Sequence, residues 1–425
     1  MITEVNNYMC EQFFILPLLL FKMIMIDSLR IDHYNYHLPE ERIASHPLLE
    51  RDASRLLLYN SGTILDKHFW ELPSLIPSDT LLVFNNTRVV PARLLFTKES
   101  GAFIEVFCLE PIEPNEYHIA FEARESVVWR AVIGNKKRWK RGEIHLYNPL
   151  NNKLISSISL SAECIEKDND TFFVRFKWSG SIPFSELLEL CGQIPIPPYL
   201  QRATEPIDIE RYQTIYASLR GSVAAPTAGL HFSENIISTL KKNNVSLSEI
   251  TLHVGAGTFM PVKTQLINQH LMHSEPFSVS LSFLERLLSH KGSVISVGTT
   301  STRCLESLYY FGLMLYMGME PQILPQWDAY SLKPVLTREE SLEQIITYLY
   351  KRNLTAFSAR TQIMIVPSFQ FRFTDGLITN FHQPKSTLLL LIAAFIGEEW
   401  RQCYAHAIEN GYRFLSYGDS SLLFR

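Results

Sequence analysis

Three histidines stand in stretches where an imidazole could move a proton. His253 lies in TLHVGAGTF, where apolar residues alternate as in a strand that then breaks into Gly-Ala-Gly. His231 ends the run GSVAAPTAGLHF, and His273 precedes Glu275 by two residues, so that on an extended segment the carboxylate could orient the ring. An imidazole with its unperturbed pKa of about 6.5 is a suitable base near neutral pH. These four residues are the candidate catalytic groups, although a packed histidine in a turn and a surface His–Glu pair remain open from the residues alone.

Small and glycine-rich stretches indicate a ligand pocket. GSVAAPTAGLHF is a poor helix because Pro226 and Gly229 lie inside it, and a poor strand because alanine, glycine and proline disfavour sheet. Its small side chains leave room for a ligand and let the backbone approach it. VGTTSTR follows a predicted strand and opens a helix, where backbone N–H groups and hydroxyls suit a carboxylate or phosphate, although an ordinary helix cap has the same pattern. The candidate ligand-binding residues are Ala225, Pro226, Thr227, Gly229, Gly255, Ala256, Gly257, Thr258, Thr299 and Thr300.

Two other stretches could contact nucleic acid. In NNTRVVPARL an asparagine could pair with a base edge and the arginines suit phosphate. RAVIGNKKRWKR has six basic residues and no acidic one, with Trp129 and Trp139 interleaved, which favours an RNA-contacting rim. A strand-end turn and a solvated hairpin are the respective alternatives. The candidate nucleic-acid contacts are Asn85, Arg88, Arg93, Lys136, Lys137, Arg138, Lys140 and Arg141.

Composition limits the class of protein. The 425 residues are 46% apolar, and 39 basic against 43 acidic residues give a net charge of −4, so a globally basic nucleic-acid coat is excluded. Six cysteines without C-x-x-C spacing predict reduced thiols and no metal site. The apolar run at 13–26 is interrupted by Lys22 and preceded by Glu4 and Glu11, unlike a signal peptide or membrane span. We expect no membrane association and interpret residues 1–24 as a dispensable N-terminal extension.

The order of predicted elements indicates the fold. The second half alternates helix and strand signals, with Ser233 as a helix N-cap and Thr337 with Glu340 as a capping box. Residues 92–181 instead carry short β-rich runs separated by turns. This pattern predicts an α/β fold with a barrel-like main domain and an inserted small all-β barrel. The expected domains are an α/β catalytic domain at 25–91 and 182–425, and a β-barrel domain at 92–181.

Taken together in one order, these motifs identify a family resemblance. LLVFNNTRVVPARL, GSVAAPTAGLHF, TLHVGAGTFMPV, HLMHSEPF, SVGTTSTRCLES and TNFHQPKSTLLLL occur within 31–425. The chain resembles the S-adenosylmethionine:tRNA ribosyltransferase-isomerase family of queuosine biosynthesis. The resemblance implies S-adenosylmethionine as ribosyl donor in the glycine-rich pocket, and a tRNA carrying 7-aminomethyl-7-deazaguanine at the wobble position as acceptor. It also implies epoxyqueuosine-tRNA, adenine and methionine as products, no metal, and a cytoplasmic monomer.

The sequence departs from the family pattern at a few positions. Asn86 stands where aspartate is usual, Gln383 where leucine is usual and Ser368 where glycine is usual, and the segment 311–360 looks longer than the typical linker. Two other functions remain as alternatives. VGAG superficially matches the glycine loop of an S-adenosylmethionine-dependent RNA methyltransferase, with Glu275 roughly 20 residues further on. A catalytically inert RNA-binding protein would keep the basic run without needing the pocket motifs.

Overall fold

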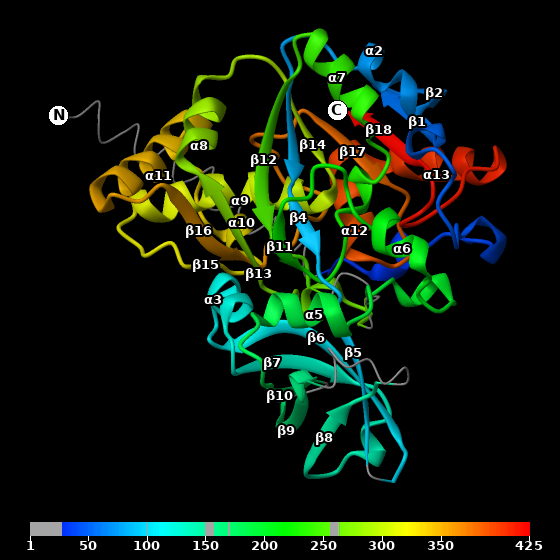
Figure 1. Cartoon of the computed structure of the whole chain (residues 1–425). Helices are drawn as coiled ribbons and strands as arrows, with labels where there is room; N and C mark the ends of the chain where they lie inside the picture. Colours follow the sequence, from blue (N-terminus) through cyan, green and yellow to red (C-terminus); the bar gives the residue numbers. More distant parts are fainter. Residues whose placement is uncertain (1–27, 99, 149–156, 169–170, 256–261, 263) are drawn as a thin grey trace. The chain divides into compact units, whose positions relative to one another are not determined.

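The computed structural model describes residues 28–98, 100–148, 157–168, 171–255, 262 and 264–425 (Figure 1). The chain divides into two compact units. The first contains the described residues of 1–85, 227–252 and 260–425, and the second those of 86–226 and 253–259. Each unit is built around its own sheet.

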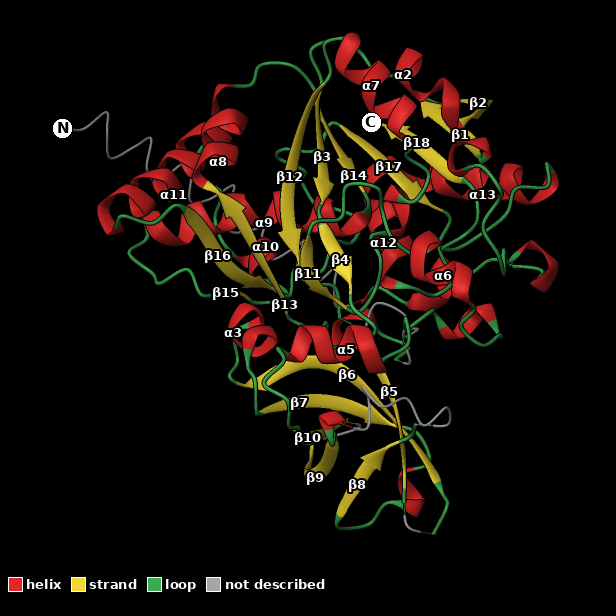
Figure 2. Ribbon diagram, viewed as in Figure 1, coloured by secondary structure: helices red, strands yellow, loops and turns green. Residues whose placement is uncertain are grey.

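A mixed ten-stranded sheet forms the framework of the first unit. In sheet order its strands are β15 (Ile323–Leu324), β16 (Ala356–Thr361), β13 (Glu275–Ser280), β12 (Ser246–Leu252), β3 (Leu81–Asn85), β14 (Val294–Val297), β17 (Gly376–Asn380), β18 (Ser420–Phe424), β1 (Arg55–Asn60) and β2 (Thr63–His68). The four central strands β12, β3, β14 and β17 are parallel to one another (Figure 2). Every residue of β3, β14 and β17 is buried, which explains their near-continuous apolar sequences.

Helices accompany this sheet along the chain. They are α2 (Leu72–Leu75), α7 (Glu234–Lys242), α8 (Leu281–Ser289), α9 (Thr299–Tyr316), α10 (Asp328–Ser331), α11 (Arg338–Arg352), α12 (Thr387–Ile396) and α13 (Trp400–Glu409). The Ser233 hydroxyl caps α7, and Thr337 and Glu340 form a reciprocal capping box on α11, so both predicted helix starts are confirmed. The helix α9 packs against the central strands and α11, and nearly all of its residues are buried.

The second unit contains a closed antiparallel barrel of six strands. In barrel order these are β10 (Thr171–Lys177), β7 (Ser126–Ile133), β6 (Phe103–Glu113), β5 (Arg93–Thr97), β8 (Glu143–Leu146) and β9 (Ser161–Asp168). Inward-facing residues such as Phe96, Trp129 and Phe176 fill its core, together with Phe184. The same unit contains α3 (Tyr117–Glu122), α5 (Phe184–Cys191), α6 (Pro206–Arg211) and a parallel pair of short strands, β4 (Thr87–Val89) and β11 (Leu219–Ser222).

The predicted fold class, α/β with an inserted small β-barrel, is confirmed. The large sheet, which the sequence predicted to be barrel-like, has two edge strands, β15 and β2, and is not closed on itself. The domain borders at 91/92 and 181/182 stay a prediction: the barrel strands run from Arg93 to Lys177, and the compact unit around them reaches Pro226. The predicted extension 1–24 lies outside the described residues. Within the described part of the chain, no helix has the length and apolar character needed to cross a membrane.

Candidate functional site

The carboxyl ends of the four central parallel strands meet at one edge of the large sheet. This edge is where α/β proteins bind ligands, because strands give way there to loops and helix starts. The strands β12, β3, β14 and β17 end there at Leu252, Asn85, Val297 and Asn380. A ligand site of the first unit is therefore expected among the residues that follow these ends.

Asn85 has a structural role at this edge. Its side-chain amide donates to the Leu252 carbonyl at 2.9 Å and its oxygen accepts from the Leu252 N–H at 3.1 Å, and the residue has no exposed surface. The amide thus joins β3 to β12 in the way a backbone ladder would. This corrects the expectation that Asn85 offers its amide to a base edge.

His231 lies in a buried hydrogen-bonded cluster in the first unit. Its Nδ1 is 2.8 Å from the Ser54 hydroxyl, and its Nε2 is 3.2 Å from the Asn380 amide nitrogen. That amide nitrogen also donates to the carbonyls of Leu415 and Ser416, which fixes which end of the Asn380 amide is the donor. Nε2 of His231 must then be the acceptor, so Nδ1 carries the proton and donates to Ser54.

This arrangement decides how His231 can act. Burial lowers its pKa to about 3, so the ring is neutral at physiological pH. Both ring nitrogens are already used, one as donor and one as acceptor. His231 therefore attaches the end of GSVAAPTAGLHF, the small-residue run at 221–232, to β17. It is a weaker candidate for a base than its sequence position indicated.

The small-residue run itself lies at the same edge. Its short 3-10 turn η7 (Thr227–Gly229) contacts β17. A Cβ placed on Gly298, the residue between β14 and α9, would lie 3.6 Å from the Cβ of Ala228. The structure therefore brings four predicted ligand-binding residues to one edge of the first unit. These are Thr227, Gly229, Thr299 and Thr300.

Glu275 is engaged in a buried ion pair. Its carboxylate accepts a hydrogen bond from the Arg303 guanidinium of α9, and both side chains are less than a tenth exposed. Arg303 also donates through Nε to the Ile363 carbonyl at 3.1 Å. His273, which precedes the strand β13, is exposed. The proposed orientation of His273 by Glu275 thus stays a prediction, and Arg303 is a partner that sequence reasoning missed.

His253 lies in the second unit between an aromatic ring and a glycine. The Tyr117 ring stacks on the imidazole with centroids 4.4 Å apart and an interplanar angle of 5°. A Cβ on Gly221, whose φ is +149°, would come within 2.3 Å of His253 Nδ1. Burial lowers the pKa of His253 to about 4, against a smaller opposing effect of the Gly221 backbone, and among the described residues its Nδ1 has no partner in hydrogen-bond geometry. His253 therefore has a neutral ring whose orientation is fixed by Tyr117 and by the backbone of Gly221.

The second unit also contains the predicted pocket residues Ala225, Pro226 and Gly255. The Ser222 hydroxyl accepts from the Val254 N–H at 3.0 Å, joining the start of the small-residue run to the residue after His253. Ala225 and Pro226 are buried, and a Cβ on Gly255 would meet no atom within 4 Å. Ala256, Gly257 and Thr258 lie outside the described residues.

Two arginines lie side by side in the second unit. Arg88 of β4 is paired in register with Arg220 of β11, and both approach one carboxylate, that of Glu189, at 4.0 and 3.6 Å. Each arginine side chain is 45% exposed. Two guanidinium groups beside a single carboxylate leave a net positive surface, which suits phosphate. Sequence reasoning found Arg88 but missed Arg220, because their pairing depends on the parallel strands.

The basic run lies on the barrel. Lys136–Arg138 form a single 3-10 turn, η5, with Lys137 and Arg138 exposed, and Lys140 and Arg141 are exposed beyond it. The interpretation of interleaved tryptophans as an RNA-stacking surface is wrong, since Trp129 and Trp139 are 1% and 0% exposed and belong to the barrel core. The predicted contact Arg93 is held by both oxygens of Glu105, each at 2.8 Å.

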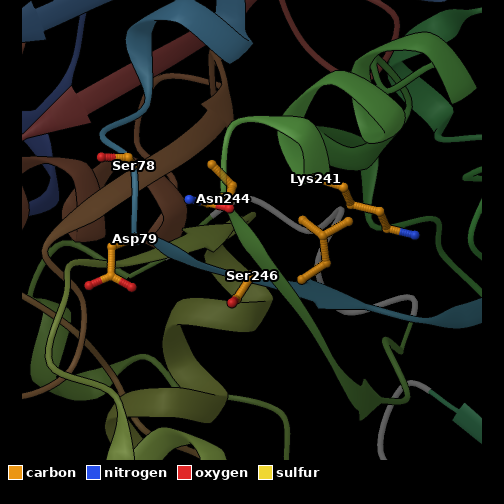
Figure 3. Close-up of a pocket in the computed structure, with 7 residues that line it drawn as sticks. Ser78, Asp79, Lys241, Asn244 and Ser246 are labelled. Atoms are coloured by element: carbon orange, nitrogen blue, oxygen red, sulfur yellow. The ribbon is translucent and has the colours of Figure 1, made fainter.

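A polar hollow of about 620 Å³ opens at the amino ends of β3 and β12 (Figure 3). Its lining includes Asp79, Lys241 and Asn244, and none of the residues predicted to bind ligand. It lies at the end of the sheet opposite to His231 and Asn380. Across the described ranges, no group of three or more His, Cys, Asp or Glu side chains is arranged to hold a metal ion.

The chain is similar to known proteins along nearly its whole length. A family model described as queuosine biosynthesis protein matches residues 31–423. A protein of Nitrosomonas europaea is 36% identical over 405 residues, which cover 94% of this chain and 98% of the relative. One of Francisella philomiragia is 38% identical over 402 residues, covering 93% of this chain and all of the relative. Both are named S-adenosylmethionine:tRNA ribosyltransferase-isomerase.

A solved structure is also similar. It is the S-adenosylmethionine tRNA ribosyltransferase of Thermotoga maritima, which is 25% identical to this chain with a TM-score of 0.44. The match covers 92% of this chain and 99% of that one.

Proposed function

The chain belongs to the queuosine biosynthesis protein family, and we propose on that premise that it is an S-adenosylmethionine:tRNA ribosyltransferase-isomerase. The observation that carries the proposal is the match to relatives of that name at 36–38% identity along nearly their whole length. The motifs at the carboxyl edge and around His253 fall inside the matched residues.

The methyltransferase alternative has no support. A dinucleotide-type site needs a free acidic residue at the end of the next parallel strand to bind ribose. Glu275 instead begins β13, which is antiparallel to β12, and its carboxylate is buried against Arg303. The relatives bear the name of the ribosyltransferase-isomerase and not of a methyltransferase.

In the proposed reaction a base takes a C5′ proton of S-adenosylmethionine, which the neighbouring sulfonium acidifies. The C5′ carbanion expels the ring oxygen from C4′, and the freed oxygen forms an aldehyde at C1′ as adenine leaves and takes up a proton. The aminomethyl nitrogen of 7-aminomethyl-7-deazaguanine in tRNA adds to C4′ of the resulting vinyl sulfonium and gives up a proton. The carbanion regenerated at C5′ bonds to C1′ and closes the carbon ring. The alkoxide formed at C1′ then displaces methionine from C5′, which closes the epoxide.

His253 is the base that the geometry favours. Its ring is held between Tyr117 and Gly221, and Nδ1 has no partner in hydrogen-bond geometry among the described residues. Burial keeps the ring neutral at physiological pH, because it lowers the pKa, and the neutral ring is the form that accepts a proton. His231 uses both ring nitrogens on Ser54 and Asn380, so we assign it a positioning role.

Asn86 has a backbone role at the start of β4. The carbonyl of Asn86 accepts from the N–H groups of Ser218 and Leu219, and the residue is 7% exposed. These backbone contacts do not depend on whether the side chain is an amide or a carboxylate. They hold the residue before β4 against the start of β11.

For the tRNA substrate we propose two contact surfaces, the paired Arg88 and Arg220, and the basic turn Lys136–Arg138. Both surfaces offer exposed guanidinium or ammonium groups. Because the chain has a net charge of −4, the phosphates of tRNA can bind only where basic side chains are concentrated locally. We further propose that the enzyme works as a cytoplasmic monomer without a metal. Sedimentation at working concentration and turnover in the presence of a chelator test the oligomeric state and the independence of metal.

Product analysis tests the function directly. The protein is incubated with S-adenosylmethionine and a tRNA carrying 7-aminomethyl-7-deazaguanine, and the small molecules and digested tRNA are analysed by mass spectrometry. Adenine, methionine and epoxyqueuosine in equal amounts are expected. S-adenosylhomocysteine would mean methyl transfer, and binding of tRNA without any small-molecule product would mean an inert RNA-binding protein.

A further inference from the structure

The helix α9 begins buried and without a side-chain cap. Thr299 and Thr300 are 6% and 8% exposed, and no side chain caps the helix at Gly298. The hydroxyls of Ser301 and Thr302 turn back to the carbonyls of the preceding residues. The first N–H groups of a helix have no partner within the helix and carry partial positive charge. A buried helix start of this kind calls for an anionic group.

Asn380 presents a second group without a partner. The residue is 3% exposed, and within the described part of the chain its Oδ1 has no hydrogen-bond partner. The Nδ2 of the same amide donates to Leu415 and Ser416, in the segment that leads into β18. The C=O and C–N bonds of an amide diverge by about 120°, so Oδ1 points away from these two carbonyls. In the sheet order, the neighbour of β17 on the side opposite to β18 is β14.

The two features lie at the same place in the first unit. The strands β14 and β17 are neighbours, with Val297 opposite Ile378, and the Gly298 N–H donates to the Ile378 carbonyl at 2.8 Å. Asn380 lies two residues beyond Ile378 on β17, and Thr299, the first residue of α9, lies two residues beyond Val297. The start of α9 is therefore next to Asn380. A buried acceptor and a buried row of donors thus stand next to each other at the carboxyl edge.

Such a pair fits a zwitterion. The helix start stabilises a carboxylate, and an amide oxygen accepts a hydrogen bond from an ammonium group. An α-amino acid carries both groups on one carbon. We infer that the carboxyl edge of β14 and β17 binds the methionyl end of S-adenosylmethionine, with the carboxylate at the start of α9 and the ammonium group on Asn380 Oδ1. This inference rests on the proposed function, and it names Asn380, which lies in TNFHQPKSTLLLL but was not among the residues that the sequence predicted to bind ligand.

The test measures dissociation constants by calorimetry for three ligands. They are S-adenosylmethionine, its decarboxylated form, and the analogue in which the ammonium group is replaced by hydrogen. Each missing group should weaken binding to the wild-type protein roughly 10- to 100-fold, the value of one charge-assisted hydrogen bond. The variants then locate the groups. Asn380→Ala should bind S-adenosylmethionine and the analogue without the ammonium group equally weakly.

Thr300→Asp supplies a second, independent variant, because an acidic residue in the first helical turn stabilises the helix. It should repel the ligand carboxylate, so S-adenosylmethionine should bind roughly 10-fold more weakly or worse, while the decarboxylated form should bind about as well as to wild type. If Asn380→Ala fails to fold, this variant decides the question. The matched control is Thr239→Asp on α7, a partly exposed threonine at another helix.

The outcomes separate the site from the function. The methionyl site is overturned if the ratios of the dissociation constants for the three ligands are the same in the variants as in wild type. If adenine is still released from S-adenosylmethionine in the presence of tRNA, the enzyme function remains intact. No release of adenine by the wild-type protein would overturn both. The site is supported if removing the ammonium group from the ligand no longer weakens binding to Asn380→Ala. It is likewise supported if removing the carboxylate no longer weakens binding to Thr300→Asp.

Discussion

The backbone of Gly221 lies against the imidazole of His253 so closely that a Cβ on the glycine would come within 2.3 Å of Nδ1 and 2.4 Å of Cε1. The two residues are 32 positions apart in the sequence. With the Tyr117 ring stacked on the imidazole, this contact fixes the orientation of the candidate base. The glycine is needed there for space and for its φ of +149°.

Gly221→Ala should therefore impair catalysis by displacing His253. A misplaced base costs roughly 100-fold in turnover, and we expect a decrease of that size in single-turnover assays. Gly62→Ala is the matched control, because Gly62 also has a positive φ, of +85°, but a Cβ added to it would meet no atom within 4 Å. It should keep wild-type turnover. Full activity of Gly221→Ala would count against His253 as the base.

The two leading histidines should respond differently to substitution. His253→Ala should reduce turnover by roughly 100- to 10,000-fold, since a general base contributes about that much, and loss of the ring stacked on Tyr117 should also lower stability. His231→Ala removes hydrogen bonds to Ser54 and Asn380 and should lower the free energy of unfolding by about 1–3 kcal/mol. Single-turnover kinetics and urea unfolding of both variants measure this. If His231→Ala is stable but inactive, His231 is the base and His253 has the positioning role.

Acid should destabilise the protein through its buried histidines. Burial lowers the pKa of His231 and His382 to about 3 and that of His253 to about 4. Below about pH 6.5 the unfolded chain takes up protons that the folded protein does not, so the free energy of unfolding falls as the pH drops from about 6.5 toward these values. Urea unfolding between about pH 7 and pH 4.5 measures the slope.

His382→Asn isolates one histidine from the carboxylates that titrate in the same range. The variant should show a shallower dependence on pH than wild type between about pH 6.5 and 4.5, because one proton uptake is removed. Parallel curves would mean that His382 is not held neutral in the folded state.

Ser368→Gly should stabilise the protein. Ser368 is exposed and has a φ of +84°, in the left-handed region that glycine adopts without a steric cost, and the family resemblance puts a glycine at this position. The gain should be about 0.5–1 kcal/mol in the free energy of unfolding, measured in urea. Ser358→Gly in β16 is the control and should destabilise, since glycine weakens a strand. A decrease in stability in Ser368→Gly would show that the serine side chain outweighs its backbone strain.

The basic turn on the barrel should contribute to tRNA affinity. A triple alanine variant of Lys136, Lys137 and Arg138 should bind tRNA more weakly, and the slope of log K against log salt should decrease by roughly 0.7–0.9 for each phosphate that is no longer neutralised. Filter binding over a range of salt concentrations gives both values.

Two comparisons make the result for the basic turn specific. Alanine at Lys241, Lys242 and Lys351, which are exposed in the first unit, removes the same number of charges and should change the slope little. S-adenosylmethionine affinity should be equal in both triple variants. Equal affinity and parallel salt curves for wild type and the barrel variant would reduce the turn to a solvated hairpin and leave Arg88 and Arg220 as the tRNA surface.

The sequence by itself determined the local structure and the family. The Ser233 cap, the capping box of Thr337 with Glu340, and the strands that precede His253 and VGTTSTR depend on residues a few positions apart, so their spacing was sufficient to predict them. The β-rich pattern of 92–181 predicted the barrel for the same reason.

Only the tertiary structure decided how the site residues are used. Ser54 meets His231 from 177 positions away, and Asn380 reaches the same ring from 149 positions away. Burial keeps His231 neutral and these contacts fix its orientation, while His253 packs against Tyr117 and Gly221. Trp139 is typical of an RNA surface by composition, yet it fills the barrel core. Burial and hydrogen-bond partners depend on packing between distant segments, and that information is absent from the spacing of residues along one chain.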